Sequence, residues 1–267
     1  MVKPSLILSL ALLCSTASAQ QGAPDTDDAI STDRPDFVES SVVVGKGRVQ
    51  VETSAAFERS SRDGVRERLV STPTLLRFGI TDTTEFRLET DGWLHGWSRG
   101  PGQADASDAS GMADTSVGVK WHLRDGKEGV PALAVLLHAD LPSGARRVGS
   151  SGVRPSLRGV AEWDLPDDYS LGVMPGLAYE RNDEGKRYTS GIFAVSLGKD
   201  FNPAWHGYVE FAAPQIARGR DGGSQMSFDF GATHLLSKQV QVDAGLALGL
   251  NRNTPDLAVS VGISFKL

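Results

Sequence analysis

Residues 240–267, the end of the chain, alternate strictly between two kinds of side chain, with a break at residues 251–255. Successive side chains of a strand leave opposite faces of the backbone, so this period of two predicts two β-strands joined by a turn. Each strand has about the 9–11 residues that a tilted membrane-spanning strand needs. One face is apolar and the other is small or polar, which is typical of the outside and inside of an outer-membrane barrel. A soluble β-sandwich hairpin also alternates, so the rest of the chain must decide between them. The apolar face holds Val242, Ala244, Leu246, Leu248, Leu250, Leu257, Val259, Val261, Ile263, Phe265 and Leu267.

The first 19 residues have the features of a secretory signal peptide. Lys3 precedes an apolar run at residues 6–13, and Ala17-Ser18-Ala19 supplies small residues before a cut. We therefore expect export and cleavage after Ala19. The single cysteine, Cys14, would leave with this leader. Its lipidation is not favoured, because the preceding leucines fit lipoprotein processing poorly.

The mature chain would be exported without cysteine and would be mildly acidic. Removal of Lys3 leaves 26 basic and 33 acidic residues, a net charge of −7. A barrel closed by backbone hydrogen bonds does not need disulfides, whereas small secreted domains often do. The acidic balance argues against a nucleic-acid partner.

Residues 20–45 are polar and acidic, contain proline, and show no strand periodicity until their end. Two interpretations remain open: a disordered periplasmic tail, or a segment folded into the lumen of a barrel. Apolar Phe37 and Val38 amid charged residues favour the second. We therefore predict a plug or gate formed by Asp33, Arg34, Asp36, Phe37 and Glu39.

Residues 46–267 continue the alternation over about twelve strands, the even number that closed bacterial barrels have. Short connections at 79–83, 165–168, 199–204 and 237–239 follow the even strands, whereas the long ones, 94–112, 141–152 and 212–223, follow the odd strands. Short periplasmic turns and long outer loops are expected of an outer-membrane barrel. Pro73 inside the second strand predicts a bulge or an irregular ladder. A belt of aromatic residues is expected near the short-turn end, where such rings prefer the membrane interface: Phe78, Trp121, Trp163, Tyr169, Trp205 and Phe265.

The predicted fold is therefore all-β: a single antiparallel up-and-down outer-membrane β-barrel at residues 46–267, preceded by a non-strand N-terminal segment. Both termini are expected in the periplasm. Several phrases of the chain carry a family resemblance: Thr32-Asp33-Arg34-Pro35-Asp36-Phe37-Val38-Glu39-Ser40, Lys46-Gly47-Arg48-Val49-Gln50-Val51-Glu52, Thr72-Pro73-Thr74-Leu75-Leu76-Arg77-Phe78-Gly79, Leu141-Pro142-Ser143-Gly144 and Gln241-Val242-Asp243. With these phrases the chain resembles the outer-membrane transporter family named after the MetA-pathway of phenol degradation. The resemblance covers nearly the whole mature chain and implies a barrel with a transport role, without identifying a solute.

Strand parity places charged residues of both signs on the inner face. In one interpretation they pair across neighbouring strands and hold water or the N-terminal segment. In the other they form a transverse field along a pore, which orients a dipolar or aromatic solute. Either arrangement predicts weak ion selectivity. The predicted lumen-lining residues are Arg48, Glu52, Arg87, Glu89, Lys120, Arg154, Arg158, Glu162, Glu210, Asp229 and Asp243, of which Arg87, Arg154, Arg158 and Glu210 are the candidate partners of the segment.

Catalysis is not expected, and neither a cofactor nor a metal is predicted. Parity points His122, His138 and His206 inward, and His234 lies at the end away from the outer leaflet. Ser143 lies near His138 in sequence, but a catalytic triad is recognised by geometry and not by proximity in the chain. The five histidines are scattered without the spacing of metal ligands.

The sequence thus predicts a transporter or narrow channel for a small solute, hydrophobic or aromatic in our expectation, in the outer membrane of a Gram-negative cell. The expected partners are outer-membrane lipid and lipopolysaccharide, the barrel-assembly machinery and the solute. The alternative is a non-conducting structural or adhesion barrel that acts through its outer loops. Trp97 and Arg99 are the only strong candidates there for a protein interface.

Overall fold

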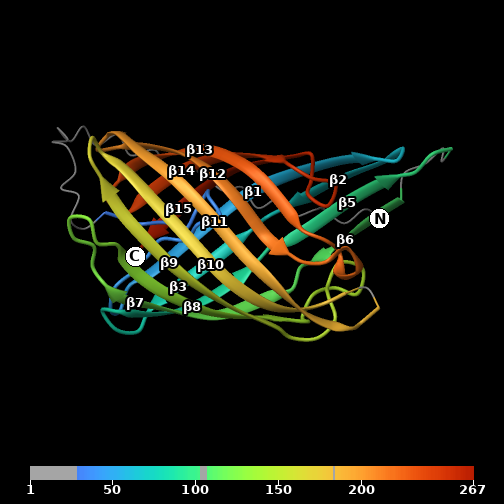
Figure 1. The fold of residues 1–267 in the computed structure, drawn as a ribbon, viewed down its shortest axis with the longest axis horizontal. Helices are drawn as coiled ribbons and strands as arrows, with labels where there is room; N and C mark the ends of the chain where they lie inside the picture. The colour runs from blue at the N-terminus through green and yellow to red at the C-terminus, as the bar shows by residue number, and fades with distance from the viewer. Residues whose placement is uncertain (1–28, 103–106, 183) are drawn as a thin grey trace, which may run out of the picture.

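The computed structural model describes residues 29–102, 107–182 and 184–267, and the predicted signal peptide lies outside these ranges. The strands form one antiparallel sheet that closes on itself, because the last strand pairs with the first. Figure 1 shows the resulting barrel, with strands tilted to its long axis. The predicted all-β barrel of twelve strands is confirmed, since three of the twelve are each divided into two pieces.

The strands in chain order are β1 Val49–Arg62, β2 Val65–Ser71, β3 Thr74–Gly79, β4 Thr84–Thr90, β5 Trp93–Arg99, β6 Ser107–Met112, β7 Thr115–Arg124, β8 Ala132–Leu141, β9 Arg154–Leu165, β10 Tyr169–Arg181, β11 Arg187–Asn202, β12 Trp205–Ile216, β13 Gln225–Ser237, β14 Val240–Gly249 and β15 Leu257–Lys266. A short 3-10 helix, Gly219–Asp221, lies in the connection between β12 and β13.

The three divided strands are neighbours, and each is interrupted for two residues. Residues 72–73 separate β2 from β3, residues 91–92 separate β4 from β5, and residues 113–114 separate β6 from β7. The irregularity predicted at Pro73 is therefore present. Its physical reason is that proline has no N–H to donate to the ladder, although the Pro73 carbonyl still accepts a hydrogen bond from Ser54 N.

The prediction of a loop at residues 94–112 was wrong, because β5 and β6 occupy much of this range and pair with each other. Together with β1 and β2 they extend the wall at the long-loop end (Figure 1). The range is rich in Gly, Ser, Ala and Asp, which are weak strand formers. Its composition therefore gave no indication of the two strands, which are defined by their backbone pairing. The connection after β8 packs against this extension, where Ala145 N donates to the Met112 carbonyl at 2.8 Å.

The two faces of the wall follow the predicted parity. In the closing hairpin, Gln241 and Asp243 are buried inside, whereas Val261 and Phe265 are exposed outside. Trp121, Tyr169 and Trp205 of the predicted aromatic belt are exposed on the outer face near the short-turn end. Among the described residues, no helix is both long and apolar enough to cross a membrane.

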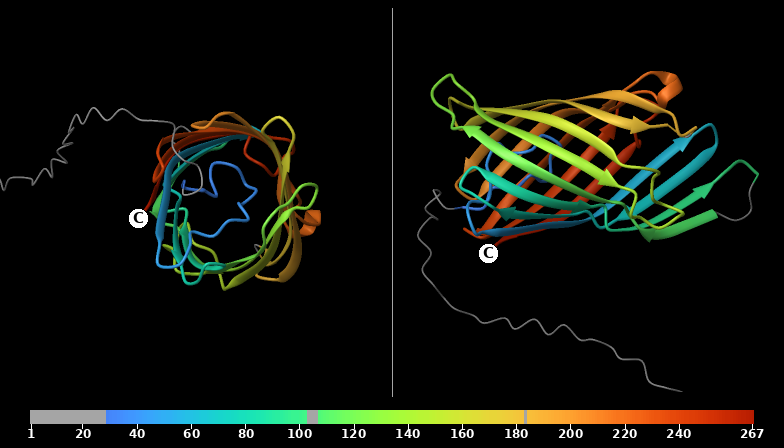
Figure 2. Two further views of the ribbon diagram at one scale, coloured as in Figure 1. Left: turned by 90° about the vertical axis from the view of Figure 1, so that its left-hand side faces the viewer. Right: turned by 90° about the horizontal axis from the view of Figure 1, so that it is seen from below.

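The segment before β1 lies inside the barrel. Figure 2, viewed along the barrel, shows this segment crossing the space enclosed by the strands. It enters from the short-turn end, where Ile30 N donates to the Lys238 carbonyl at 2.7 Å. It leaves through a turn at Gly45 and Gly47, which both adopt the positive φ that glycine tolerates best.

Candidate functional site in the barrel lumen

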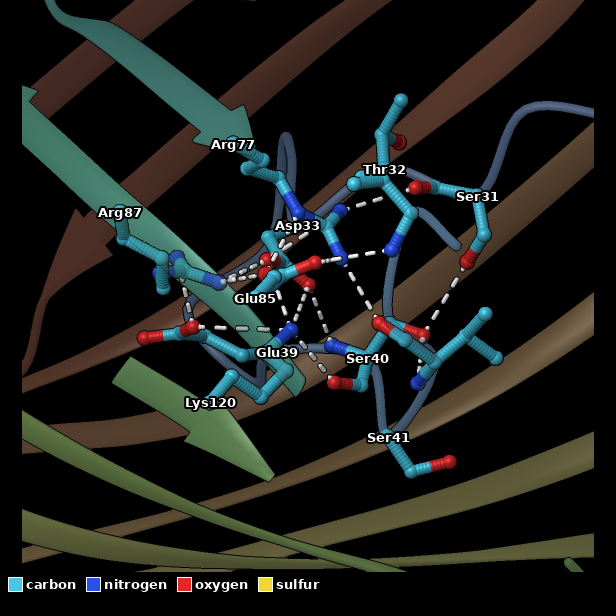
Figure 3. Close-up of polar contacts among 12 residues, drawn as sticks. Ser31, Thr32, Asp33, Glu39, Ser40, Ser41, Arg77, Glu85, Arg87 and Lys120 are labelled. Atoms are coloured by element: carbon cyan, nitrogen blue, oxygen red, sulfur yellow. Dashed lines mark hydrogen bonds and ion pairs between the residues drawn. The ribbon is translucent and has the colours of Figure 1, made fainter. Parts of the chain in front are cut away.

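A buried cluster of charges joins the N-terminal segment to the wall formed by β1, β3, β4 and β7 (Figure 3). Asp33 of the segment is its centre. Lys120 Nζ lies 2.8 Å from both carboxylate oxygens of Asp33, and Arg87 bonds one of them. Arg77 lies 3.4 Å from the same carboxylate. Because opposite charges surround it, Asp33 is fixed in a buried site that could not hold a lone carboxylate.

The cluster extends from Asp33 to further carboxylates, so that its signs balance. Glu39 of the segment forms ion pairs with Arg87 and Arg158, each at 2.8 Å. Arg77 in turn bonds two wall carboxylates, at 3.0 Å and 2.8 Å. Four acids (Asp33, Glu39, Glu52 and Glu85) therefore meet four bases (Arg77, Arg87, Lys120 and Arg158). Balanced pairing of this kind is the condition under which buried charges persist.

Glutamates on the wall also bind the backbone of the segment. Glu210 accepts from Phe37 N and Val38 N, one with each oxygen, at 2.8 and 2.7 Å. Three further backbone N–H groups of the segment donate to wall glutamates: Asp33 N to Glu52, Ser41 N to Glu162 and Val44 N to Glu85. Hydrogen bonds to a charged group contribute about 1.5–3 kcal/mol each. The wall thus recognises the path of the segment as well as its side chains.

Wall donors bind the carbonyls of the same segment. Arg77 donates to the Ser31 and Val42 carbonyls at 2.9 and 2.7 Å, and Lys120 donates to the Ser40 carbonyl at 2.8 Å. Backbone groups buried away from water need such partners. Donors and acceptors on the wall therefore replace the hydrogen bonds that secondary structure would otherwise supply.

An apolar patch on the inner wall holds the middle of the segment. Val38 is buried in it and Phe37 packs against it. Gly172 of β10 makes this close approach possible, because a Cβ at that position would lie 2.8 Å from Val38 Cγ1. The wall residues of the patch are Ala134, Leu136, Val160, Met174, Ala194 and Ala212.

A cavity of about 920 Å³ remains beside the segment, toward the short-turn end. Arg34, Asp36, Glu162 and His206 are among its lining residues. The segment therefore does not fill the lumen at this level, and the barrel is wider than the chain that crosses it. At the edge of the cavity, Arg34 lies 3.6 Å from Asp243.

The acidic side chains of the segment respond to these surroundings in opposite directions. Burial alone would raise the pKa of Asp33, but Arg77, Lys120 and Arg87 outweigh it and hold that pKa well below its usual range. Burial also opposes ionisation of Glu39, yet Arg87 and Arg158 leave its pKa lowered. Asp36 has no such cation. Burial, with Glu162 and Asp33 nearby, raises the pKa of Asp36 to about 7 despite a hydrogen bond with Ser196.

This difference predicts a pH dependence of segment docking. A released Asp36 would regain its ordinary pKa of 3.8, so the docked state binds a proton more tightly than the released state. The stabilisation is fully present at low pH and is lost as the pH rises through about 7. We expect the open probability of the channel to rise roughly tenfold between about pH 5 and pH 8, because Asp36 is half-buried and only part of the shift survives solvent screening. Single-channel recording checks this.

Asp36→Asn should remove most of that pH dependence. The matched control is Asp82→Asn, since Asp82 is an exposed acid in the short turn between β3 and β4. This control variant should show the same pH dependence of open probability as the wild type. An Asp36→Asn channel that kept the full pH dependence would assign it to carboxylates of the wall.

The structure brings together most of the residues that sequence analysis selected. Asp33, Phe37 and Glu39 of the segment contact the wall as described above, and Arg34 and Asp36 line the cavity. The selected lumen residues that contact the segment are Glu52, Arg87, Lys120, Arg158, Glu162, Glu210 and Asp243.

Four selected residues lie elsewhere. Arg154 pairs with Asp140 at 3.1 Å, beyond the segment on the long-loop side. Glu89 lies 3.7 Å from His138, and Asp229 bonds Ser227. Arg48 precedes β1 and is exposed at the rim of the barrel.

Several residues that hold the segment were missed by sequence reasoning. Arg77 lies in the irregular strand at Pro73, where parity was hardest to assign, whereas parity placed Glu85 on the face of Arg87 but it was not selected. Gln50 and Gln241 donate to the Ser31 carbonyl and the Thr32 hydroxyl, but uncharged side chains gave no signal. Across the described part of the chain, no group of three or more side chains is placed to hold a metal ion.

Comparison with known proteins agrees with this architecture. The family model described as "Putative MetA-pathway of phenol degradation" matches residues 32–267. The crystal structure of an outer membrane channel from Pseudomonas putida F1 is similar, with 14% identity, a TM-score of 0.64, and coverage of 89% of this chain and 100% of that chain. The KdgM porin has 12% identity and a TM-score of 0.50, covering 81% and 98%. The beta domain of the Bordetella autotransporter Brka has 15% identity and a TM-score of 0.51, covering 82% and 98%.

At these identities the solved structures show a shared barrel fold and nothing finer. A search among curated proteins found no match. The family model, in contrast, spans most of the chain and includes both the segment and the barrel, so the resemblance seen in the sequence is confirmed. The protein therefore belongs to the family described as "Putative MetA-pathway of phenol degradation" and has the β-barrel fold of outer-membrane channels.

Proposed function

We propose that the protein is a narrow outer-membrane channel for a small solute, closed in this structure by residues 29–45. The observation that carries this proposal is the match between the wall and the segment. Glu210 binds two consecutive backbone N–H groups, and three wall cations surround Asp33. A tail without a role would not need a lumen built around its backbone.

The proposed open state has a physical basis, because the wall keeps part of its charge pairing without the segment. When the segment leaves, Arg77 keeps Glu52 and Glu85 as partners, and Arg87 keeps Glu85 at 3.2 Å. Water entering the lumen would solvate the rest, including Lys120. Release therefore replaces buried ion pairs by hydrated charges. This change costs far less free energy than leaving one charge buried without a partner.

An emptied lumen would carry a transverse field. The cations Arg77, Arg87 and Lys120 lie on β3, β4 and β7. The acids Glu210 and Asp229 lie on β12 and β13, on the other side of the ring. Charged walls of opposite sign orient a dipolar molecule while selecting only weakly by net charge. This supports passage of a small molecule in preference to a dedicated ion channel.

A non-conducting barrel that acts through its outer loops is the less favoured function. The specialised contacts described above lie inside the barrel and not on its outer connections. We further infer that residues 1–19 direct export and that the barrel-assembly machinery inserts the chain among outer-membrane lipid and lipopolysaccharide. The support for this inference is the leader and the apolar outer face.

A disulfide lock tests whether release of the segment opens the channel. A Cβ at position 172 would lie 3.8 Å from Val38 Cβ, which matches the spacing across a disulfide. The thiol of Val38→Cys would also replace the methyl group that crowds Gly172. We expect the oxidised Val38→Cys/Gly172→Cys variant to show no openings at membrane potentials that open the wild type. Reduction should restore these openings.

Each single-cysteine variant is the control and should respond to neither oxidant nor reductant. The only native cysteine, Cys14, lies in the predicted leader, so no other disulfide competes. If the oxidised double variant conducts as the reduced one does, with its disulfide verified by mass spectrometry, the segment is not the gate.

A further inference from the structure

One row of inward-facing side chains departs from the polar character of the lumen. In register across neighbouring strands, Ala134 lies opposite Val160, Met174 opposite Ala194, and Ala194 opposite Ala212. Leu136 adjoins the row from β8, and all six residues are buried. Five consecutive strands, β8 to β12, thus present one apolar band to the inside of the barrel.

The adjoining row toward the short-turn end is polar. There Glu162 lies opposite Gly172, Ser196 opposite Glu210, and Glu210 opposite Asp229. Glu210 holds the backbone of Phe37 and Val38, which places their side chains against the apolar band. The two rows together form one site, in which Glu210 is a hydrogen-bond acceptor on the short-turn side and the apolar band lies on the long-loop side.

Phe37 occupies this site in the closed structure. Its ring packs against the apolar band while the Arg158 guanidinium lies over the ring, 5.6 Å from its centre. A cation above a ring and an apolar surface beside it are a general recognition pattern for aromatic groups. The backbone of the segment is held by Glu210 independently of the ring, so the aromatic site and the backbone site are separable.

The band needs a cover whenever the segment leaves. An inner wall that faces water is ordinarily polar, since apolar surface in contact with water raises the free energy. In the closed structure Phe37 and Val38 supply that cover. In the open state proposed above, the band and Arg158 would face the lumen unfilled, on the path of any solute.

We propose that the apolar band of β8–β12, with Arg158, is a binding site for an uncharged aromatic solute, which Phe37 occupies in the closed state. Solute and segment compete for it, so solute binding favours opening. The opening of the channel by the solute rests on the proposed function, whereas binding of the solute to the band does not depend on conduction.

Phe37→Ala tests the site in the full mature chain. The substitution removes the ring and keeps the backbone N–H that Glu210 binds. We expect fluorobenzene, followed by ¹⁹F NMR in one detergent throughout, to bind Phe37→Ala saturably and about tenfold or more tighter than the wild type, because a protein cavity lined by apolar side chains binds such rings. Val42→Ala is the matched control: Val42 belongs to the same segment, is 46% exposed, and lies outside the band. It should bind as the wild type does.

A second variant, Phe37→Ala/Met174→Gln, keeps the length of the side chain but makes the band polar, and should lose the added binding. Equal binding by Phe37→Ala and Val42→Ala would overturn the proposal, whatever the double variant does. Sodium benzoate, a ring of similar size that carries a charge, should not bind; benzoate that binds as well as fluorobenzene would overturn the assignment to uncharged solutes.

Conductance separates this inference from the proposed function. Fluorobenzene should raise the open probability of the wild type and act at lower concentration on Phe37→Ala. Saturable binding to a barrel that never conducts would leave the site standing and remove the channel. Conduction by a barrel whose Phe37→Ala variant shows no added binding would support the channel and remove the aromatic binding site.

Discussion

Removal of residues 20–45 should turn a nearly silent barrel into a steadily conducting one. In planar bilayers the full mature chain should open rarely, because the segment crosses the lumen and is bound on both sides by the wall. If the closed form outnumbers the open form by about 99 to 1, deletion of the segment raises the mean current roughly a hundredfold. Single-channel recordings of both proteins at one salt concentration measure this directly.

The deletion should still fold, which makes its result interpretable. The wall cations Arg77 and Arg87 retain wall carboxylates, and the closing pairs between β1 and β15 do not involve the segment. Heat-modifiable migration on gels verifies the barrel. A chain that lacks only residues 20–28 is the matched control, since it keeps every segment residue that contacts the wall as described above, and it should stay silent. If the barrel without residues 20–45 folds but does not conduct, the result would favour the alternative function, a non-conducting barrel that acts through its outer loops.

The fold was predictable because a barrel wall repeats one simple rule. Each residue of the closing hairpin reports its face by parity, and Asp243 and Val261 lie where parity placed them. The alternation of short and long connections was a second, independent indication of an outer-membrane barrel. Parity gives a face and not a partner, however, so the contact between Arg158 and Glu39 follows from the three-dimensional register and from the path of the segment.

The rest of the site was hidden for physical reasons. At Leu136, Val160 and Met174 both faces of the strand are apolar, so the alternation that marks a lumen position disappears. The band becomes recognisable only when register aligns five strands. The hydrogen bonds from Phe37 N and Val38 N to Glu210 were equally hidden, since backbone donors carry no signature in the sequence.

Asp33→Ala should open the channel almost as far as the deletion does. Asp33 is bound by Lys120, Arg87 and Arg77, and it also accepts a hydrogen bond from Ser40 N at 2.8 Å. Its loss leaves these cations with one carboxylate too few. Breaking a buried pair by removing one partner costs about 3–5 kcal/mol, which is a factor of roughly 10² to 4 × 10³ in the ratio of closed to open forms. Open probability in bilayers is the measurement, and Asp82→Ala, which changes an exposed acid in the short turn between β3 and β4, should leave it unchanged.

A charge-balancing double variant shows whether electrostatics is the cause. Lys120→Met removes one cation from the same cluster, so Asp33→Ala/Lys120→Met restores the balance of signs around the segment. Groups in direct contact are expected to be coupled, and the double variant should therefore be more closed than Asp33→Ala alone. This rescue cannot arise from general damage to the barrel, because a second core substitution would add to such damage. A double variant no more closed than Asp33→Ala would show that the hydrogen bonds of Glu210 and the packing of Val38 hold the segment, and that the buried charges only tolerate it.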